Sequence, residues 1–227
     1  MVINMLGLNC SPRDRSNSAA MLAVGKQYLD EKYKGEVDFR IIHLRDLNIM
    51  HCLACNVCGK TKDTGEFIPC VSKDKDDVQQ VLDALLWSDG FAVATPVYFG
   101  MPSDLFTKFV MRTRVLRHQN FALANRVFGV LAVAGRRSGG SETAIFTTWL
   151  AFIRNNCIPV GNGNLTGQFG TMAWAGPREA VLTDEWGLEQ ARATCERIYS
   201  LARVVKAGQA ALGEKPSMTF CYKSGMR

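Results

Sequence analysis

Four cysteines are the residues of this sequence best able to do chemistry. Cys52, Cys55 and Cys58 recur at steps of three, and Cys70 follows after a gap of eleven residues. Three thiols at this spacing form a tight turn and can all point at one object. A cubic iron–sulfur cluster requires such a turn, because each of its closely spaced irons takes one thiolate. The run therefore predicts an iron–sulfur cluster on these four residues, most simply of the 4Fe-4S type.

Zinc and disulfides are the competing interpretations of the same cysteines. Zinc sites more often use two Cys-x-x-Cys pairs separated by a dozen or more residues, whereas here the third cysteine crowds the second. Disulfides fit less well, since no signal-peptide pattern is visible and 227 residues can form a core without staples. The isolated cysteines, Cys10, Cys157, Cys195 and Cys221, are typical of small buried residues.

The composition of the chain is that of a globular domain and argues against a membrane protein or a nucleic-acid-binding protein. The 47% hydrophobic and 21% charged residues are ordinary for a soluble globular domain, so we expect residues 1–227 to form one domain, with residues 45–73 as an inserted cluster loop. No apolar run is long enough for a membrane span, and no basic run is interleaved with aromatics as nucleic-acid binding would require. We expect a reducing cytoplasm. The net charge of +6 suits an anionic cofactor or an acidic electron-transfer partner.

The elements that must position these residues follow from hydrophobic periodicity, which predicts strands and helices in alternation. Strands are expected at 2–8, 37–44, 91–95, 127–134 and 158–160, and helices at 16–34, 76–88, 103–117, 142–155 and 184–212. Five strands alternating with five helices predict an α/β fold with a parallel sheet that is covered on both faces.

Ligands of such sheets bind beyond the carboxyl ends of the strands, and three loops are expected there. The first combines hydroxyls, arginines and a helix N-terminus, which favours a phosphate group. Its candidate ligands are Ser11, Arg13, Ser16, Asn17 and Ser18. The loop has neither the spacing of a nucleoside triphosphate loop nor that of a dinucleotide loop, and it also reads as a capped helix with solvated arginines.

The second and third loops are candidates to frame a flat ring. The second runs through Thr95, Pro96, Val97, Tyr98, Phe99 and Gly100, and the third contains Ala134, Gly135, Arg136, Gly139 and Gly140. Glycines let the backbone approach a ring closely, although core aromatics and a flexible turn explain the same residues. Together with a phosphate loop at the same end of the sheet, the three loops predict an FMN site.

These residues resemble the iron–sulfur flavoproteins, within the flavodoxin-like NAD(P)H:FMN reductase group. The matching segments are Ser11-Pro12-Arg13, the cysteine run, Ser88-Asp89-Gly90, Thr95 to Gly100, Gly139-Gly140-Ser141-Glu142-Thr143 and Asp184 to Glu189, and they span nearly the whole chain. The resemblance implies a flavodoxin-like doubly wound sheet, for which we expect the strand order 2-1-3-4-5. It also implies one FMN and one cubic cluster per chain, and a homodimer or homotetramer.

The implied activity is an oxidoreductase that moves electrons between a donor such as ferredoxin or NAD(P)H and an acceptor. One alternative is a dehydrogenase of a chorismate-like amino acid, because Arg13, Arg15, Arg136 and Arg137 could bind a small anionic substrate. Another is a zinc-stabilised, flavin-binding redox sensor. The chain departs from the family in its longer gap before Cys70, which makes a 3Fe-4S cluster on three thiolates conceivable, and in Met111, where many relatives carry Asp.

Overall fold

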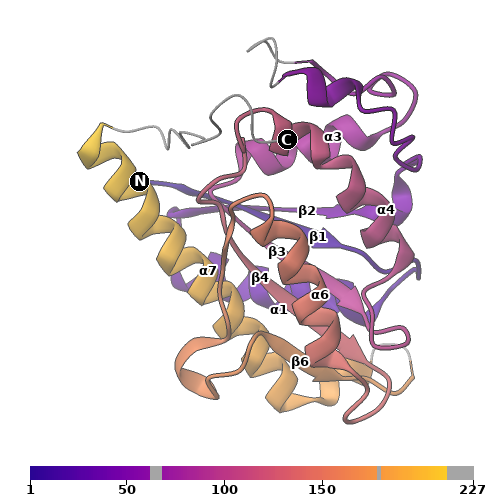
Figure 1. The fold of residues 1–227 in the computed structure, drawn as a ribbon. Helices are drawn as coiled ribbons and strands as arrows, with labels where there is room; N and C mark the ends of the chain where they lie inside the picture. Colours follow the sequence, from indigo (N-terminus) through magenta and orange to yellow (C-terminus); the bar gives the residue numbers. More distant parts are fainter. Residues whose placement is uncertain (62–67, 178–179, 214–227) are drawn as a thin grey trace.

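Six strands form one parallel sheet at the centre of the molecule (Figure 1). The computed structural model describes residues 1–61, 68–177 and 180–213. The strands are β1 (Ile3–Asn9), β2 (Val37–His43), β3 (Gly90–Pro96), β4 (Val127–Ala134), β5 (Ile158–Pro159) and β6 (Thr171–Trp174). Their order is β2-β1-β3-β4-β5, with β6 also paired to β4. The predicted order of the first five strands is confirmed.

The sixth strand corrects the sequence prediction, which treated residues 161–183 as a connection. β5 pairs with β4 only at Val127 and Phe128, and β6 pairs with the other half of β4, from Leu131 onward. The chain re-enters the sheet at Gly170, where a Cβ atom would lie 2.5 Å from the carbonyl oxygen of Val130. The sequence around it is rich in glycine and asparagine, which predicts a connection. The strand itself has only four residues, of which the first and third are buried.

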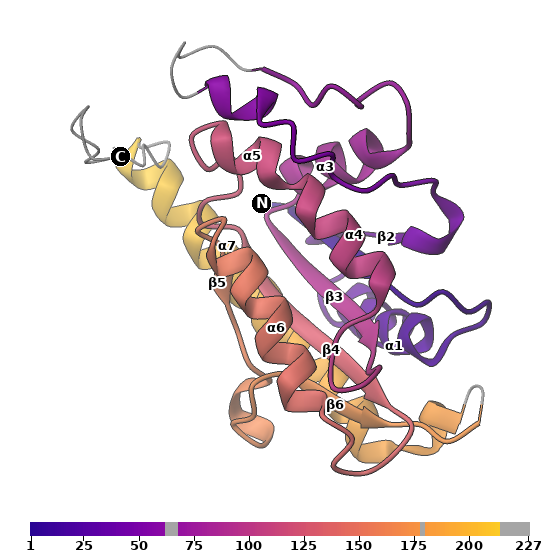
Figure 2. The same ribbon diagram turned by 45° about the vertical axis from the view of Figure 1, so that its right-hand side comes forward.

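Helices cover both faces of the sheet (Figures 1 and 2). On one face, α1 (Asn17–Lys32) and the long α7 (Glu185–Leu212) pack side by side and bury Met21, Leu22 and Ile198. On the other face lie α3 (Val78–Trp87), α4 (Asp104–Arg112), α5 (Arg114–His118) and α6 (Ser141–Ile153). None of the helices in the described ranges has the length and apolar character needed to cross a membrane.

The helix predicted at 103–117 is divided into α4 and α5 at Thr113. The hydroxyl of Thr113 donates a hydrogen bond to the carbonyl oxygen of Val110 at 2.7 Å, and its backbone N–H bonds the same oxygen at 3.1 Å. These two bonds close the last turn of α4, so α5 starts afresh at Arg114. Arg112 and Arg114 lie on either side of this break. Both line a cavity together with the four cysteines of the predicted cluster loop.

The predicted cluster loop connects β2 to α3. It contains two short 3-10 helices, η1 (Leu44–Asp46) and η2 (Val57–Lys60), and η2 packs on α5. Residues 62–67 of this loop lie outside the described part of the chain. Two further 3-10 helices, η3 (Gly163–Leu165) and η4 (Ala180–Thr183), flank β6.

Candidate functional site

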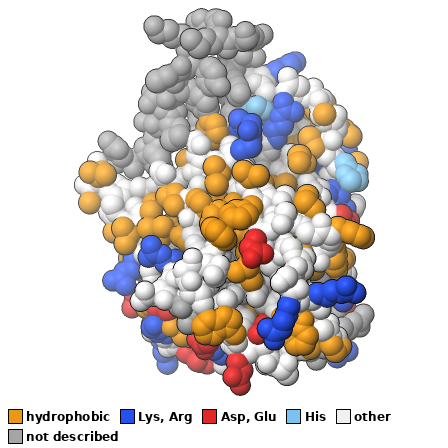
Figure 3. Space-filling model, turned by 60° about the horizontal axis from the view of Figure 1, so that its bottom comes forward, with side chains coloured by type: hydrophobic (Ala, Val, Ile, Leu, Met, Phe, Trp, Pro, Cys, Tyr) orange, Lys and Arg blue, Asp and Glu red, His pale blue; other side chains and the backbone are white. Residues whose placement is uncertain are grey.

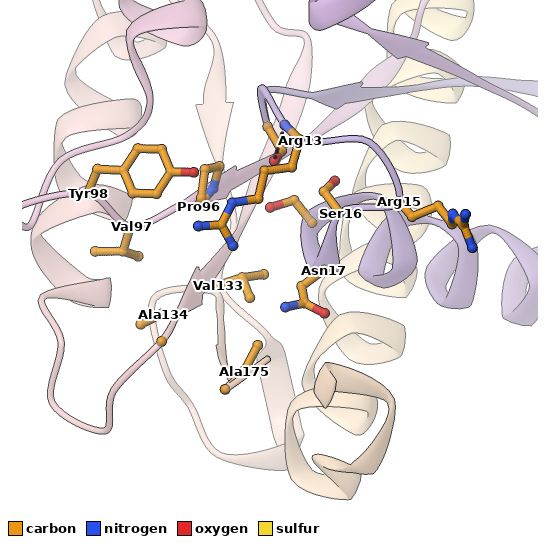
Figure 4. A pocket seen from close by; sticks show the side chains of 14 residues that line it. Arg13, Arg15, Ser16, Asn17, Pro96, Val97, Tyr98, Val133, Ala134 and Ala175 are labelled. Carbon is orange, nitrogen blue, oxygen red and sulfur yellow. Dashed lines mark hydrogen bonds between the residues drawn. The ribbon is translucent and has the colours of Figure 1, made fainter. Parts of the chain in front are cut away.

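A cavity of about 250 Å³ lies at the carboxyl ends of β1, β3 and β4 (Figure 4). Three loops that are far apart in sequence meet there. The predicted residues that line it are Ser11, Arg13, Ser16, Asn17, Ser18, Pro96, Val97, Tyr98, Ala134 and Gly135, and they are joined by Arg15, Val133, Ala175 and Gly176. The structure thus brings part of each of the three predicted loops to the same cavity.

The first loop is shaped by the last residue of β1. The side-chain oxygen of Asn9 accepts a hydrogen bond from the backbone N–H of Ser11 at 3.2 Å, and the hydroxyl of Ser11 accepts one from the N–H of Arg13 at 3.3 Å. Ser16 caps α1 by accepting from the N–H of Ala19 at 3.1 Å. Asn9 is a residue that sequence reasoning missed, although a polar side chain ending a buried strand is a usable signal.

Positive charge dominates the cavity wall. The guanidinium of Arg13 projects into the centre of the cavity, whereas the side chain of Arg15 points away from the other lining residues (Figure 4). No carboxylate in residues 1–61, 68–177 or 180–213 forms an ion pair with either arginine. The N-terminus of α1 adds a partial positive charge, so the cavity attracts an anionic group.

Asn17 contributes an orphaned polar atom to the same cavity. Its amide nitrogen donates to the carbonyl oxygen of Pro177 at 3.3 Å, while its side-chain oxygen is buried and has no partner among the described residues. Buried oxygens are normally hydrogen-bonded, so this atom is available to a ligand that carries hydroxyl or N–H donors. FMN combines such donors with a phosphate, and the residues present fit it.

The other predicted residues of the second and third loops lie outside the cavity lining. These are Thr95, Phe99, Gly100, Arg136, Gly139 and Gly140. Thr95 is buried, and its hydroxyl accepts from the N–H of Ser103 at 3.1 Å, which anchors the second loop to α4. Gly140 has φ +90°, and a Cβ atom there would lie 2.8 Å from the Cα of Gly100. The second and third loops therefore touch through the backbone of Gly100 and Gly140. Thr95 and these two glycines hold the loops in place.

Two further residues escaped sequence reasoning because they follow the unpredicted strand. Ala175 and Gly176 come directly after β6 and line the cavity next to Pro177, whose carbonyl oxygen accepts a hydrogen bond from the side chain of Asn17. Cys10 lies near the first loop but is fully buried, and burial raises the pKa of its thiol. It is a packing residue, as its isolated position predicts.

The predicted metal ligands line a second, smaller cavity. Cys52, Cys55, Cys58 and Cys70 all contribute to it, together with Arg112 and Arg114. Cys52 and Cys55 are exposed, and the other two thiols are half-buried. Burial raises the pKa of Cys58, although the nearby Arg114 acts in the opposite direction.

The donor set of this second cavity fits an iron–sulfur cluster. Four thiols and two guanidinium groups surround one space, and a cluster bound by four thiolates carries negative charge that the arginines would balance. The four thiols line this cavity but are not arranged to hold a single metal ion, and no other group of three or more His, Cys, Asp or Glu side chains within the described ranges is so arranged. Cys221 lies outside the described residues.

A buried ion pair closes the base of the cysteine loop. The side chains of Arg112 and Asp76 are 1% and 0% exposed, and their charged atoms are 2.5 Å apart. Asp76 also accepts from the backbone N–H groups of Met50, at 2.8 Å, and Val78, at 3.3 Å. Burial alone would raise the pKa of Asp76, but these hydrogen bonds together hold it below its usual value.

Comparison with known proteins agrees with this geometry. Residues 3–171 match the family of NADPH-dependent FMN reductases. An iron–sulfur flavoprotein of Methanocaldococcus jannaschii is 33% identical over 204 residues, which is 88% of this chain and 98% of that protein. One of Archaeoglobus fulgidus is 28% identical over 213 residues, covering 90% and 98%.

Solved structures share the fold. A flavodoxin, WrbA-like protein of Agrobacterium tumefaciens superimposes with a TM-score of 0.59 at 18% identity, covering 89% of this chain and 98% of its own. At that identity the likeness concerns the fold alone. It supports the flavodoxin-like architecture read from the strand order.

Proposed function

Because this chain belongs to the iron–sulfur flavoproteins of the NADPH-dependent FMN reductase family, we propose that it uses two cofactors. Electrons would pass through both an FMN and an iron–sulfur cluster. It is a flavin-dependent oxidoreductase. The observation that carries the proposal is that four thiols line one cavity in a chain whose strand ends form an arginine-rich cavity that fits FMN.

The FMN phosphate is assigned to the first loop. Arg13 reaches into the cavity, and the capped N-terminus of α1 presents unpaired backbone N–H groups beside it. Ser11, Ser16 and Ser18 complete the polar side of the cavity, and Asn17 offers its unpartnered oxygen to a hydroxyl of the ligand. Pro96, Val97, Tyr98, Ala134 and Gly135 form the side assigned to the ring.

The cluster is assigned to Cys52, Cys55, Cys58 and Cys70, with 4Fe-4S as the expected type. When bound, FMN supplies one- and two-electron chemistry and the cluster supplies one-electron transfer. The protein contributes the thiolates and the compensating charge of Arg112 and Arg114. We place the protein in a reducing, cytoplasmic compartment, which preserves four free thiols.

Metal and flavin analysis of protein purified without oxygen tests the proposal. We expect a brown protein that contains iron, sulfide and FMN. Cys55→Ala removes a thiol of the cavity and is expected to abolish the cluster, whereas Cys157→Ala, a matched change at a buried thiol, is expected to leave it intact. Stoichiometric zinc without iron would overturn the cluster and favour the zinc-stabilised redox sensor. FAD in place of FMN would overturn the flavin assignment.

The electron donor is proposed to be ferredoxin or NAD(P)H. The family description names NADPH, and a one-electron cluster suits a ferredoxin. Anaerobic stopped-flow reduction by each donor separates them through the rate of flavin bleaching. The alternative, a dehydrogenase of a chorismate-like amino acid, gains no specific support, since Arg136 and Arg137 are not among the described residues that line the cavity, and Arg137 lies over the ring of Trp174.

We further propose a symmetric dimer or tetramer. Phe99 is fully exposed beside the flavin cavity, and Met101 and Met111 are 43% and 60% exposed. Figure 3 brings the bottom of the view in Figure 1 forward and shows hydrophobic side chains gathered across the middle of that face. A neighbouring subunit that packs over exposed Cys52 and Cys55 would shield the cluster and bring it close to that neighbour's FMN.

Light scattering at micromolar concentration tests the assembly. We expect the mass of two or four subunits, and we expect Phe99→Glu to shift the mass toward the monomer because it places charge on an exposed aromatic position. A stable monomer that keeps an intact cluster and fast flavin reduction would defeat this part of the proposal.

A further inference from the structure

Arg112 is positioned to act on one cysteine of the cluster cavity. It is the last residue of α4 and is only 3% exposed. One terminal nitrogen of its guanidinium donates to the carbonyl oxygen of Met50 at 3.0 Å and to the carboxylate of Asp76. The other terminal nitrogen donates to the sulfur of Cys70 at 3.5 Å. The guanidinium therefore joins both ends of the cysteine loop to a candidate ligand.

The surroundings fix this geometry. The carboxylate of Asp76 accepts hydrogen bonds from the guanidinium of Arg112. It also accepts from the backbone N–H groups of Met50 and Val78, which fix its position. A buried guanidinium with a buried carboxylate partner has little freedom to turn, because any rotation would leave a charge unpaired. The N–H that faces Cys70 is consequently aimed by the fold, and Cys70 is the thiol that the long gap separates from the other three.

We propose that Arg112 is a positioning residue that holds Cys70 as the fourth thiolate of the cluster and raises the reduction potential of that cluster. The inference rests on the proposed function, in that the four cysteines must bind a cluster. Donors to a metal-bound ligand orient it and tune the metal, and cluster potentials respond to net charge and to hydrogen bonds to sulfur.

The sign of the effect follows from charge. Reduction adds one electron to the cluster, with no bond formed or broken and no proton required. The reduced form is more negative, so the positive charge of Arg112 stabilises it more than the oxidised form. The carboxylate of Asp76 has the opposite influence.

Arg114 provides the matched comparison. It lines the same cavity, but its guanidinium donates to the side chain of Asn56 at 2.6 Å and to His118 at 3.0 Å. It therefore supplies charge near the thiols without the bond to Cys70 that Arg112 makes. Lys108, also on α4 but not among the described residues lining the cavity, serves as a charge-matched control.

The experiment measures iron content, electron paramagnetic resonance and the cluster potential of the anaerobically purified holoprotein, with dithionite as reductant. Arg112→Gln is expected to bind iron about 10- to 100-fold more weakly, and the fraction that has lost the Cys70 thiolate should show a 3Fe signal before dithionite is added. In the fraction that keeps the four-iron cluster, the potential should fall by about 59 mV, a tenfold change in the ratio of reduced to oxidised cluster at fixed potential. Asp76→Asn should raise the potential. Arg114→Gln should lower it while keeping full iron, and Lys108→Gln should change neither.

Opposite shifts in Arg112→Gln and Asp76→Asn distinguish tuning from a structural role, since damage to the loop would move both variants the same way. Should either single variant fail to fold, the double variant Asp76→Asn with Arg112→Gln replaces the whole buried pair by neutral residues and leaves no buried charge unpaired. It must still lose iron. Full iron with a wild-type signal in that double variant, or equal shifts in the two single variants, overturns the inference. A wild-type protein without iron and sulfide would instead overturn the proposed function.

Discussion

Replacing Arg13 with glutamine is expected to weaken FMN binding far more than the same replacement at Arg15. Both arginines lie in the loop between β1 and α1 and both line the cavity. Only Arg13 extends its guanidinium into the centre of that cavity, whereas Arg15 points away (Figure 4). The two variants lose the same charge, so their difference isolates direct contact from general attraction.

The magnitude follows from the kind of contact. A hydrogen bond to a charged group is worth about 1.5–3 kcal/mol, and 1.4 kcal/mol corresponds to about tenfold in affinity, so Arg13→Gln should weaken binding about 10- to 150-fold. Arg15 acts on the phosphate mainly through attraction that salt screens within about 8–10 Å. Arg15→Gln should therefore cost no more than about threefold at physiological ionic strength.

Titration of deflavinated protein with FMN, followed by quenching of flavin fluorescence, gives both dissociation constants. Thermal unfolding of each variant controls for loss of fold. Equal losses in the two variants, or a larger loss for Arg15→Gln, would refute the assignment of the phosphate to Arg13.

Three further predictions concern stability and reactivity. Gly140→Ala forces alanine into φ +90° and against Gly100, which should cost at least about 1–2 kcal/mol and lower the melting temperature by about 2–4 °C per kcal/mol, whereas Gly208→Ala, a helical position with open space, should not destabilise. Burial would raise the pKa of Glu196, but hydrogen bonds from Lys32, Tyr28 and Tyr33 hold it below its usual value. The unfolded state then binds more protons, so the contribution of Glu196 to the free energy of unfolding is complete above about pH 4.3 and is lost as pH falls through the folded pKa. Denaturation measured between about pH 3 and 6 should show that the free energy of unfolding falls less steeply with acid in Glu196→Gln than in the wild type. An unchanged slope would contradict this. Burial raises the pKa of Cys157 to about 12, so iodoacetamide at pH 8 should spare it and modify exposed Cys52 and Cys55 in cluster-free protein; mass spectrometry showing equal labelling would count against it.

Local patterns in the sequence determine much of this protein. Strands rich in buried apolar residues and helices with one apolar face predicted the alternation of five strands with five helices, because periodicity depends only on neighbouring residues. The order of those five strands was expected from the flavodoxin-like resemblance. The cysteine run and the three strand-end loops were also visible, since each is short and carries its chemistry within a few residues. The family resemblance rests on the same segments.

Only the tertiary structure decided how distant residues meet. Ala175 and Gly176 reach the flavin cavity because β6 re-enters the sheet beside β4, which a four-residue strand between glycines did not reveal. Arg112 meets Cys70 across 42 positions of sequence, and it does so because α4 ends at Arg112 and Asp76 binds the guanidinium at the base of the loop. Such contacts join segments with no shared periodicity, so their geometry exists only once the sheet and its helices have packed.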